Sequence, residues 1–216
     1  MAKNDSNDAS DDDADHDFGG AWTEIKLEAV EYYLNLYAKA LSAHFDLRYI
    51  DAFAGSGRRT VMQIEGGLLT GTPISVKKKK LDGSAPRALR VTPPFSEYIF
   101  IEKNARRYKA LKALKSKFAG KKIRCVRGNA NDEIEKLLRE PWVRSGKGRA
   151  VVFLDPYSLQ VEWKTLVALA KTRVVDVWYL FPLRDVVRQL AHDFQAIDTH
   201  KAKALDRVLG PDWREL

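Results

Sequence analysis

A chain of 216 residues with 45% hydrophobic residues is long enough for one domain with a substantial core. It contains no run of roughly 18 apolar residues and no basic-then-apolar leader at its N-terminus, so we expect a cytoplasmic protein that does not associate with membranes. The single cysteine and the scattered histidines exclude an internal disulfide and show no metal-ligand spacing, so we predict no metal site.

The charge of the chain is distributed unevenly. Residues 1–20 contain seven Asp and one Lys, so they carry −6 of the formal net +8 and leave +14 on residues 21–216. These first residues have too few apolar side chains to form a core, and we expect a disordered acidic tail. Its role is either to solubilise the chain or to compete with nucleic acid for the basic surface of the domain at 21–216.

The domain should begin with a helix, because apolar residues recur at helical spacing from residue 22 to residue 41. The expected buried face consists of Trp22, Ile25, Ala29, Tyr33, Tyr37, Ala40 and Leu41. A strand, LRYIDAF at 47–53, then leads into a glycine turn. Residues 58–95 should form an irregular insertion, since they contain several glycines, four consecutive lysines and two adjacent prolines.

The rest of the chain alternates strands with helices. Strands are expected at EYIFIE (97–102), KIRCVRG (122–128), RAVVFLD (149–155) and VVDVWYLF (174–181). Helices are expected at 104–120, 132–139, 161–172 and 184–194, with Asn104 as the N-cap of the first. This alternation implies parallel strands joined by right-handed crossovers, and therefore a Rossmann-like three-layer α/β sandwich with a mostly parallel sheet.

Ligands of such a sheet bind beyond the carboxyl ends of its strands. Four expected strand ends carry polar residues: DAFAGSG at 51–57, Glu102, GNAND at 128–132 and DPYS at 155–158. All four should face one crevice.

The glycine turn does not match the phosphate-binding loops. A Walker loop needs Lys followed by Ser or Thr after its second glycine, and Arg58 stands there. A dinucleotide fingerprint would need glycine at Thr60 and an acid about 20 residues on, whereas Glu102 lies farther away unless the insertion accounts for the spacing.

A methionine-derived sulfonium cofactor suits the turn better, because it offers an ammonium group and a ribose diol in place of phosphates. Asp51 and Glu102 would bind these two groups, and Gly55 and Gly57 would allow the backbone to approach the cofactor closely. The alternative is a turn of the kind that also occurs in proteins without ligands.

The stretch FLDPYS resembles the (Asp/Asn)-Pro-Pro-(Tyr/Phe) motif of amino-group methyltransferases. In that chemistry an acid accepts hydrogen bonds from an exocyclic amine, and an aromatic ring stacks on the base that carries it. Asp155 and Tyr157 would hold these roles, on either side of Pro156. Alternatively, Asp155 caps the next turn and Tyr157 packs on the sheet edge.

Two further patterns allow a functional and a structural interpretation. In GNAND, Asn129 or Asp132 would meet the adenine amino group of the cofactor, or Asn131 or Asp132 would cap the following helix. The lysines and arginines at 104–122 are either a solvated helix face or, together with the four lysines at 77–80, a surface for nucleic-acid phosphates.

Five stretches carry a resemblance to a known family: YIDAFAGSGRRT, DGSAPRAL, PPFSEYIFIEKN, FLDPYSLQVEWKTL and VVDVWYLFPL, in this order. From about residue 21 to its C-terminus the chain resembles the three-Cys-motif partner protein (TcmP) family, bacterial proteins with a methyltransferase-like fold. The cysteines in that name belong to a companion protein. The resemblance implies a class I methyltransferase-type fold, S-adenosylmethionine as cofactor and the three-Cys-motif companion as partner.

The resemblance also implies site residues by position. It places the cofactor site on Asp51, Phe53, Ala54, Gly55, Gly57 and Glu102, the fourth motif on Asp155, Pro156 and Tyr157, and an arginine near the substrate on Arg188. Ser158 replaces a glycine that is usual after DPY, which would narrow the substrate mouth. Relatives continue beyond GPDWREL, so we expect a sheet truncated at the C-terminus.

The function predicted from these residues is an S-adenosylmethionine-dependent N-methyltransferase that acts on nucleic acid. The alternative is a non-catalytic protein that works in complex with a three-Cys-motif protein, and an NAD-dependent oxidoreductase is a more distant third.

Overall fold

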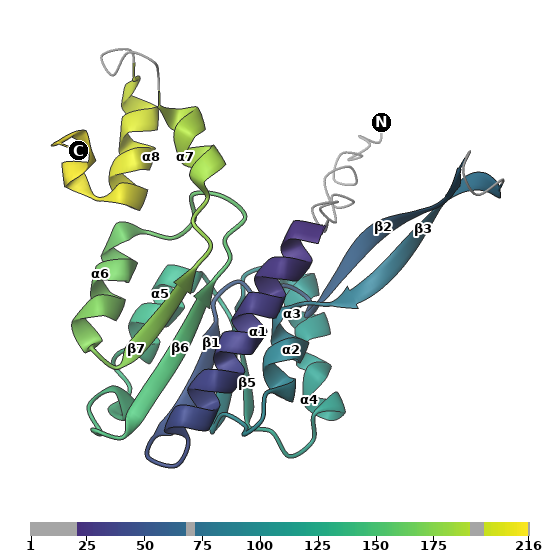
Figure 1. Cartoon of the computed structure of the whole chain (residues 1–216). Helices are drawn as coiled ribbons and strands as arrows, with labels where there is room; N and C mark the ends of the chain where they lie inside the picture. The colour runs from purple at the N-terminus through teal and green to yellow at the C-terminus, as the bar shows by residue number, and fades with distance from the viewer. Residues whose placement is uncertain (1–20, 68–71, 191–196, 216) are drawn as a thin grey trace, which may run out of the picture.

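The computed structural model describes residues 21–67, 72–190 and 197–215, so the predicted acidic tail lies outside the described residues. Its centre is a five-stranded, wholly parallel sheet in the order β5-β4-β1-β6-β7 (Figure 1). The strands are β1 (Asp46–Asp51), β4 (Glu97–Glu102), β5 (Ile123–Arg127), β6 (Gly148–Leu154) and β7 (Val175–Tyr179). The predicted Rossmann-like three-layer sandwich is confirmed.

Helices cover both faces of the sheet. One face carries α1 (Ala21–Leu41), α2 (Ser84–Arg90), α3 (Ala105–Lys112) and α4 (Leu114–Lys117), and the other carries α5 (Ala130–Leu137) and α6 (Trp163–Thr172) (Figure 1). Each face has its own apolar core: Tyr49 of β1 belongs to the first core and its neighbour Ile50 to the second. Because both faces are covered, β4 is buried at every residue, as expected for a parallel strand.

The strand order reverses at β1. From β1 the chain first builds outward through β4 and β5, and then returns to the other side of β1 to add β6 and β7. The carboxyl ends of β1 and β6 therefore form the switch point at which open α/β sheets bind their ligands.

The prediction of an irregular insertion at 58–95 is wrong. Strands β2 (Arg58–Gly67) and β3 (Thr72–Asp82) form an antiparallel hairpin that extends away from the sheet (Figure 1), and α2 follows it. The N–H of Gly83 donates to the carbonyl of Gly57 at 3.1 Å and closes the base of the hairpin. An antiparallel ladder is held by its own backbone hydrogen bonds, so glycines and lysines in the sequence do not exclude it.

The first helix is confirmed, and its predicted buried face is correct in part: Tyr37 is buried, and Tyr33 and Leu41 pack against the first core. The buried residues are Leu27, Val30, Leu34, Tyr37 and Ala38. Ile25, Ala29 and Ala40 are exposed, whereas Tyr33 and Leu41 are half-buried. Helix α1 is apolar on both sides, so periodicity alone could not decide which side packs on the sheet.

The other predicted helices are confirmed with changed limits. Asn104 caps α3 as predicted, because its side chain accepts a hydrogen bond from the Arg107 N–H at 3.0 Å. The predicted helix at 104–120 is divided into α3 and α4 at Ala113. Helix α5 begins at Ala130 with Asn129 as its N-cap, so the capping roles considered for Asn131 and Asp132 are wrong.

The end of the chain forms a small helical unit, which the sequence did not predict in full. It consists of α7 (Leu183–Gln189), α8 (Thr199–Leu209) and the 3-10 helix η3 (Pro211–Glu215), while a further 3-10 helix, η1 (Pro141–Val143), precedes β6. The predicted end of α7 at residue 194 lies outside the described residues. A third apolar cluster holds this unit: Leu159, Val186, Leu205, Val208 and Trp213.

Within the described part of the chain, no helix combines the length and the apolar character that crossing a lipid bilayer requires.

Candidate functional site

Three carboxylates lie at one edge of the sheet. Asp51 is the last residue of β1, Glu102 is the last residue of β4, and Asp155 follows the end of β6. Since β1 lies between β4 and β6 and all three strands are parallel, these residues meet at the predicted switch point. We call Asp51, Glu102 and Asp155 the carboxylate cluster.

Asp51 lies at the centre of the carboxylate cluster and is fully buried, with 0% exposure. Its Oδ1 accepts a hydrogen bond from the Phe53 N–H at 3.1 Å, and its Oδ2 accepts one from the Ser84 hydroxyl of α2 at 2.5 Å. Burial raises the pKa of Asp51 to about 7; the two hydrogen bonds oppose this rise, and the charges of Asp155 and Glu102 add to it. The side chain is therefore poised between its protonated and ionised forms at neutral pH.

Glu102 is also buried, at 6% exposure. Its Oε1 accepts hydrogen bonds from the Asn104 N–H at 2.7 Å and from the Arg107 guanidinium at 3.2 Å. No hydrogen bond from the described residues reaches Oε2. Glu102 is thus fixed by one oxygen, and the other oxygen retains its capacity to accept.

Asp155 is the most accessible member, with 36% of its side chain exposed. Its Oδ1 lies 3.8 Å from the Lys26 ammonium of α1. Burial raises the pKa of Asp155, and Lys26 opposes this rise. The sequence analysis did not identify Lys26. Helical spacing offers a signal for it, because Lys26 lies one turn before Val30 on the same helix face as Val30 and Tyr37, which is the side that packs on the sheet.

The glycine turn joins the carboxylate cluster to the hairpin. Gly55 and Gly57 both have positive φ, at +59° and +73°. A Cβ at Gly57 would come within 2.9 Å of Leu114 Cδ1, so this glycine permits packing against α4, and its role in cofactor approach remains a prediction. A Cβ at Gly55 would meet no atom within 4 Å, so the space beside Gly55 is open.

Phe53 and Ala54 shape the same turn. The Ala54 N–H donates to the Ile101 carbonyl at 3.1 Å, which ties the turn to β4, and Ala54 is buried at 5% exposure. The Phe53 side chain packs against the second core. Both residues therefore position the turn.

The loop after β6 carries the DPY motif. Pro156 is buried, whereas Tyr157 is 65% exposed, and its N–H donates to the Gln160 side chain at 3.3 Å. The alternative in which Tyr157 packs on the sheet edge does not fit this exposure. Its aromatic ring is presented at the surface next to Asp155.

Asn131 fixes this loop, and sequence reasoning missed that role. Asn131 is buried at 6% exposure, and its Nδ2 donates to the Gln160 carbonyl at 2.9 Å. Its Oδ1 accepts from the Glu162 N–H at 3.0 Å and from the Thr165 hydroxyl at 2.8 Å. The side chain thus ties α5 to the end of the loop and to the start of α6.

Three predicted site residues show no link to the carboxylate cluster in the part of the chain that the structure describes. Asn129 is exposed, and its side chain accepts from the Asn131 N–H at 2.9 Å as the cap of α5. Asp132 is exposed on the first turn of α5. Arg188 lies on α7 and pairs with Asp185 at 3.7 Å, with 65% of its side chain exposed. Their predicted roles remain predictions.

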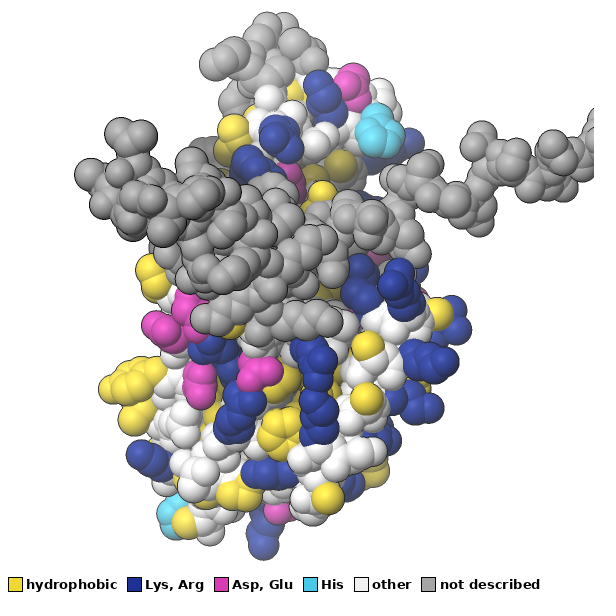
Figure 2. Space-filling model, turned by 90° about the vertical axis from the view of Figure 1, so that its right-hand side faces the viewer, with side chains coloured by type: hydrophobic (Ala, Val, Ile, Leu, Met, Phe, Trp, Pro, Cys, Tyr) yellow, Lys and Arg dark blue, Asp and Glu magenta, His cyan; other side chains and the backbone are white. Residues whose placement is uncertain are grey.

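A basic surface borders the site. The sequence between Glu102 and Asp132 contains no Asp or Glu. Its exposed cations lie on α3 and α4 and on either side of them: Lys103, Arg106, Arg107, Lys109, Lys112, Lys115, Lys117, Lys122 and Arg127. Figure 2 views this side of the molecule and shows more Lys and Arg than Asp and Glu side chains on it. Glu102 pairs with Arg107 and Gly57 packs on Leu114, so this surface adjoins the carboxylate cluster.

Comparisons with known proteins add little. No protein-family model matches the chain, and no curated protein matches it. Solved structures that resemble it include the crystal structure of protein LPL1258 from Legionella pneumophila str. Philadelphia 1, described as a DUF519 protein. That likeness has 15% sequence identity and a TM-score of 0.47 over 71% of this chain and 67% of the other, and it does not bear on function.

Proposed function

We propose that this chain binds S-adenosylmethionine and transfers its methyl group to an amino nitrogen of nucleic acid, as a member of the TcmP-like methyltransferases. The observation that carries the proposal is the carboxylate cluster at the switch point of a parallel sheet, next to a glycine turn that leaves open space at Gly55. Three acids at the carboxyl ends of neighbouring strands suit a cationic ligand with hydroxyl groups better than a phosphorylated one.

The residues present fit this cofactor. Glu102 retains an oxygen that can accept hydrogen bonds from a ribose diol, and Asp51 can pair with an ammonium group. A positive charge beside Asp51 favours its ionised form and lowers its pKa from about 7, so cofactor binding would release protons. The sulfonium of the bound cofactor supplies an electrophilic methyl group.

Asp155 and Tyr157 are the proposed acceptor residues. The Asp155 carboxylate accepts hydrogen bonds from the exocyclic amine and orients its nitrogen lone pair, and the exposed Tyr157 ring stacks on the base. Lys26 favours the ionised form of Asp155, which is the form that accepts. Lys26 is therefore a positioning residue for Asp155.

The basic surface on α3 and α4 supports a nucleic-acid substrate. Each phosphate that a lysine or arginine neutralises releases counterions, so binding there should weaken steeply with salt. For a single-stranded oligonucleotide, the slope of the logarithm of the binding constant against the logarithm of the salt concentration should become shallower by about one to two in the double variant Lys109→Gln, Lys115→Gln. Lys171→Gln with Lys201→Gln, on α6 and α8, is the matched control and should leave the slope unchanged.

Calorimetric titration with S-adenosylmethionine and S-adenosylhomocysteine tests the proposed cofactor site. We expect micromolar binding that Asp51→Asn and Glu102→Gln each weaken by at least tenfold, whereas Asp212→Asn, at an exposed acid on η3, leaves it intact. Binding that survives Asp51→Asn with Glu102→Gln in one chain would contradict the site. In Asp155→Ala, transfer should be lost while cofactor affinity stays within a few-fold.

One observation favours a non-catalytic partner protein as the second candidate. Ile25, Tyr32 and Leu36 form an exposed apolar stripe along α1, with exposures of 54%, 68% and 48%. Such a stripe is typical of a protein-binding surface, and a three-Cys-motif companion would be its partner. In this case Asp155→Ala would still complement function in cells, whereas Tyr32→Asp would not.

A further inference from the structure

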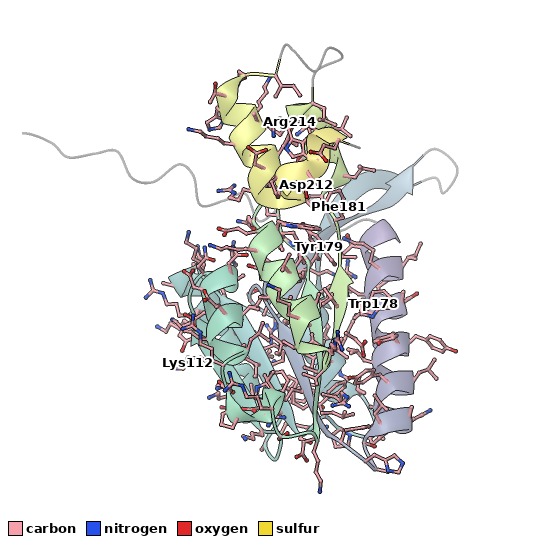
Figure 3. The ribbon with its side chains drawn as sticks, turned by 90° about the vertical axis from the view of Figure 1, so that its left-hand side faces the viewer. Lys112, Trp178, Tyr179, Phe181, Asp212 and Arg214 are labelled. Atoms are coloured by element: carbon pink, nitrogen blue, oxygen red, sulfur yellow. The ribbon has the colours of Figure 1, made fainter. Side chains whose placement is uncertain are left out.

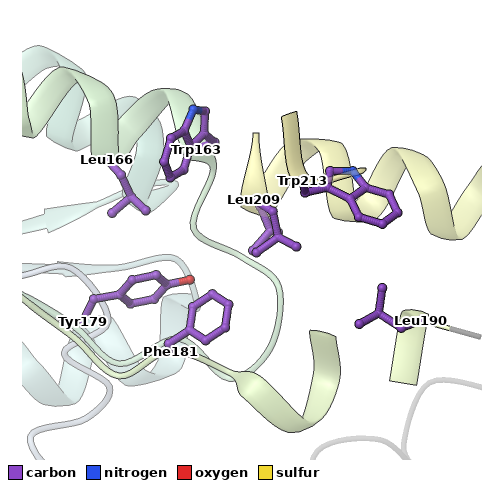
Figure 4. A pocket seen from close by; sticks show the side chains of 8 residues that line it. Trp163, Leu166, Tyr179, Phe181, Leu190, Leu209 and Trp213 are labelled. Atoms are coloured by element: carbon purple, nitrogen blue, oxygen red, sulfur yellow. The ribbon is translucent and has the colours of Figure 1, made fainter. Parts of the chain in front are cut away.

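A second cavity lies away from the carboxylate cluster. It has a volume of about 530 Å³ and lies between α6, the end of β7 and the C-terminal helices (Figures 3 and 4). Its lining is formed by Trp163, Leu166, Tyr179, Phe181, Leu190, Val208, Leu209 and Trp213. None of these described lining residues carries a charge. Pockets of about 300–1,000 Å³ with this kind of lining are typical of small-molecule sites.

The sheet separates this cavity from the carboxylate cluster. Tyr179 pairs in register with Leu154 and packs against the second core, which α5 and α6 cover. Tyr49 packs in the first core, on the other face of the sheet. Asp51 follows Tyr49 by two residues and therefore shares that face, where Ser84 of α2 contacts it. The cavity is a site of its own.

Two features of the cavity point to a ligand. The Tyr179 hydroxyl is buried and has no hydrogen-bond partner among the described residues. A buried hydroxyl without a partner is costly, and a ligand atom that accepts its proton would remove that cost. Trp163 and Phe181 also remain 43% and 41% exposed beside the cavity, so a ligand that covers their rings would remove apolar surface from water.

Contacts with neighbouring residues hold the aromatic walls of the cavity. The Trp213 indole N–H donates to Asp206 at 2.7 Å, and the Arg214 guanidinium lies 4.4 Å from the Trp213 ring centre. The Tyr179 and Phe181 rings meet edge-to-face at 5.6 Å. Rigid walls reduce the ordering that binding requires and so favour affinity.

Gly210 sets the position of the Trp163 ring. Its φ is +91°, and a Cβ there would come within 2.8 Å of the Trp163 indole nitrogen. The indole can therefore lie against the end of α8 only because residue 210 has no side chain.

We propose that this cavity binds an uncharged, flat heteroaromatic molecule of one or two rings whose acceptor atom takes a hydrogen bond from the Tyr179 hydroxyl. The lack of charged lining residues selects a neutral ligand, and the four aromatic side chains select a flat one. Burial raises the pKa of Tyr179 to about 12, so its hydroxyl keeps its proton and donates at neutral pH. This inference does not depend on methyl transfer.

Quinoline and naphthalene provide a matched pair of probes, because they share one shape and only quinoline has an acceptor nitrogen. Binding is followed by the indole N–H signals of the ¹⁵N-labelled full chain in two-dimensional NMR, with each compound at equal concentration below the solubility of naphthalene. We expect quinoline to shift the Trp163 and Trp213 signals and to bind more tightly than naphthalene. The Trp142 and Trp178 signals should not move.

Two variants complete the test. Tyr179→Phe should lower the affinity for quinoline about three- to tenfold and leave the affinity for naphthalene unchanged, because only the hydrogen bond is lost. Leu209→Trp should fill the cavity and abolish both shifts, with unchanged Trp142 and Trp178 signals as proof of folding. Four results would each overturn the proposal: shifts at indoles other than Trp163 and Trp213, shifts of equal size in Leu209→Trp, equal affinity for quinoline and naphthalene, or no binding of either compound. The last result would favour a protein-docking groove.

Discussion

Replacing Asp51 by Asn should make the protein more stable while it weakens cofactor binding. Asp51 is fully buried, and its pKa rises from 3.8 to about 7 on folding. The folded state therefore holds the Asp51 proton more tightly than the unfolded state does. Between pH 4 and pH 7 the folded state binds more protons, so the free energy of unfolding falls as the pH rises through this window and levels off above it.

The size of this effect follows from the shift. About 1.4 kcal/mol for each pKa unit gives about 4 kcal/mol of destabilisation above pH 7 relative to a neutral side chain. An Asn side chain keeps the acceptor for the Phe53 N–H and gains an NH₂ group that can donate to the Ser84 hydroxyl. We therefore expect Asp51→Asn to gain several kcal/mol at pH 8 and much less at pH 4.5.

Urea unfolding at a series of pH values from 4.5 to 8 measures this difference for the wild type and Asp51→Asn. Asp212→Asn removes an exposed carboxylate of η3 and serves as control, and its unfolding free energy should follow that of the wild type throughout. A difference between Asp51→Asn and the wild type that does not grow with pH, or an Asn variant less stable at pH 8, would refute the assignment of a buried carboxylate with a raised pKa.

Three further predictions concern binding, the loop and the turn. Binding of S-adenosylmethionine at pH 7 should release about half a proton from Asp51, seen as a buffer-dependent enthalpy between phosphate and Tris that disappears in Asp51→Asn; a buffer-independent enthalpy in the wild type would argue against it. Asn131→Ala should lower the free energy of unfolding by about 2–5 kcal/mol in urea titrations, because buried partners in the loop and α6 lose their hydrogen bonds. A loss below about 1 kcal/mol would mean that Asn131 does not hold the loop. In urea titrations, Gly55→Ala should lower the free energy of unfolding by about 1 kcal/mol and Gly57→Ala by about 2 kcal/mol or more, since only a side chain at 57 also meets Leu114. In calorimetric titrations, Gly55→Ala should weaken S-adenosylmethionine binding more than Gly57→Ala does. The reverse order in either measurement would contradict the turn geometry.

The sequence alone determined the architecture and much of the cofactor side of the proposed site. Apolar, β-branched strands alternate with helices, and a chain of this kind buries both faces of its strands by covering a parallel sheet with helices. Parallel strands end at one edge, so Asp51, Glu102 and Asp155 could be placed together from their positions in the sequence. The cap at Asn104 was local as well, because a cap depends on a few consecutive residues.

Tertiary structure decided what depends on contacts between distant residues. Helix α1 has apolar residues on two sides, and only packing on the sheet shows that Leu27, Val30 and Leu34 are inside and that Lys26 reaches Asp155. The hairpin at 58–82 is held by cross-strand backbone bonds, which leave no periodic signal in a stretch rich in glycine and lysine. The aromatic cavity joins α6, β7, α8 and η3, and no local pattern brings Trp163, Tyr179 and Trp213 together, because their meeting depends on how the C-terminal helices close over the sheet.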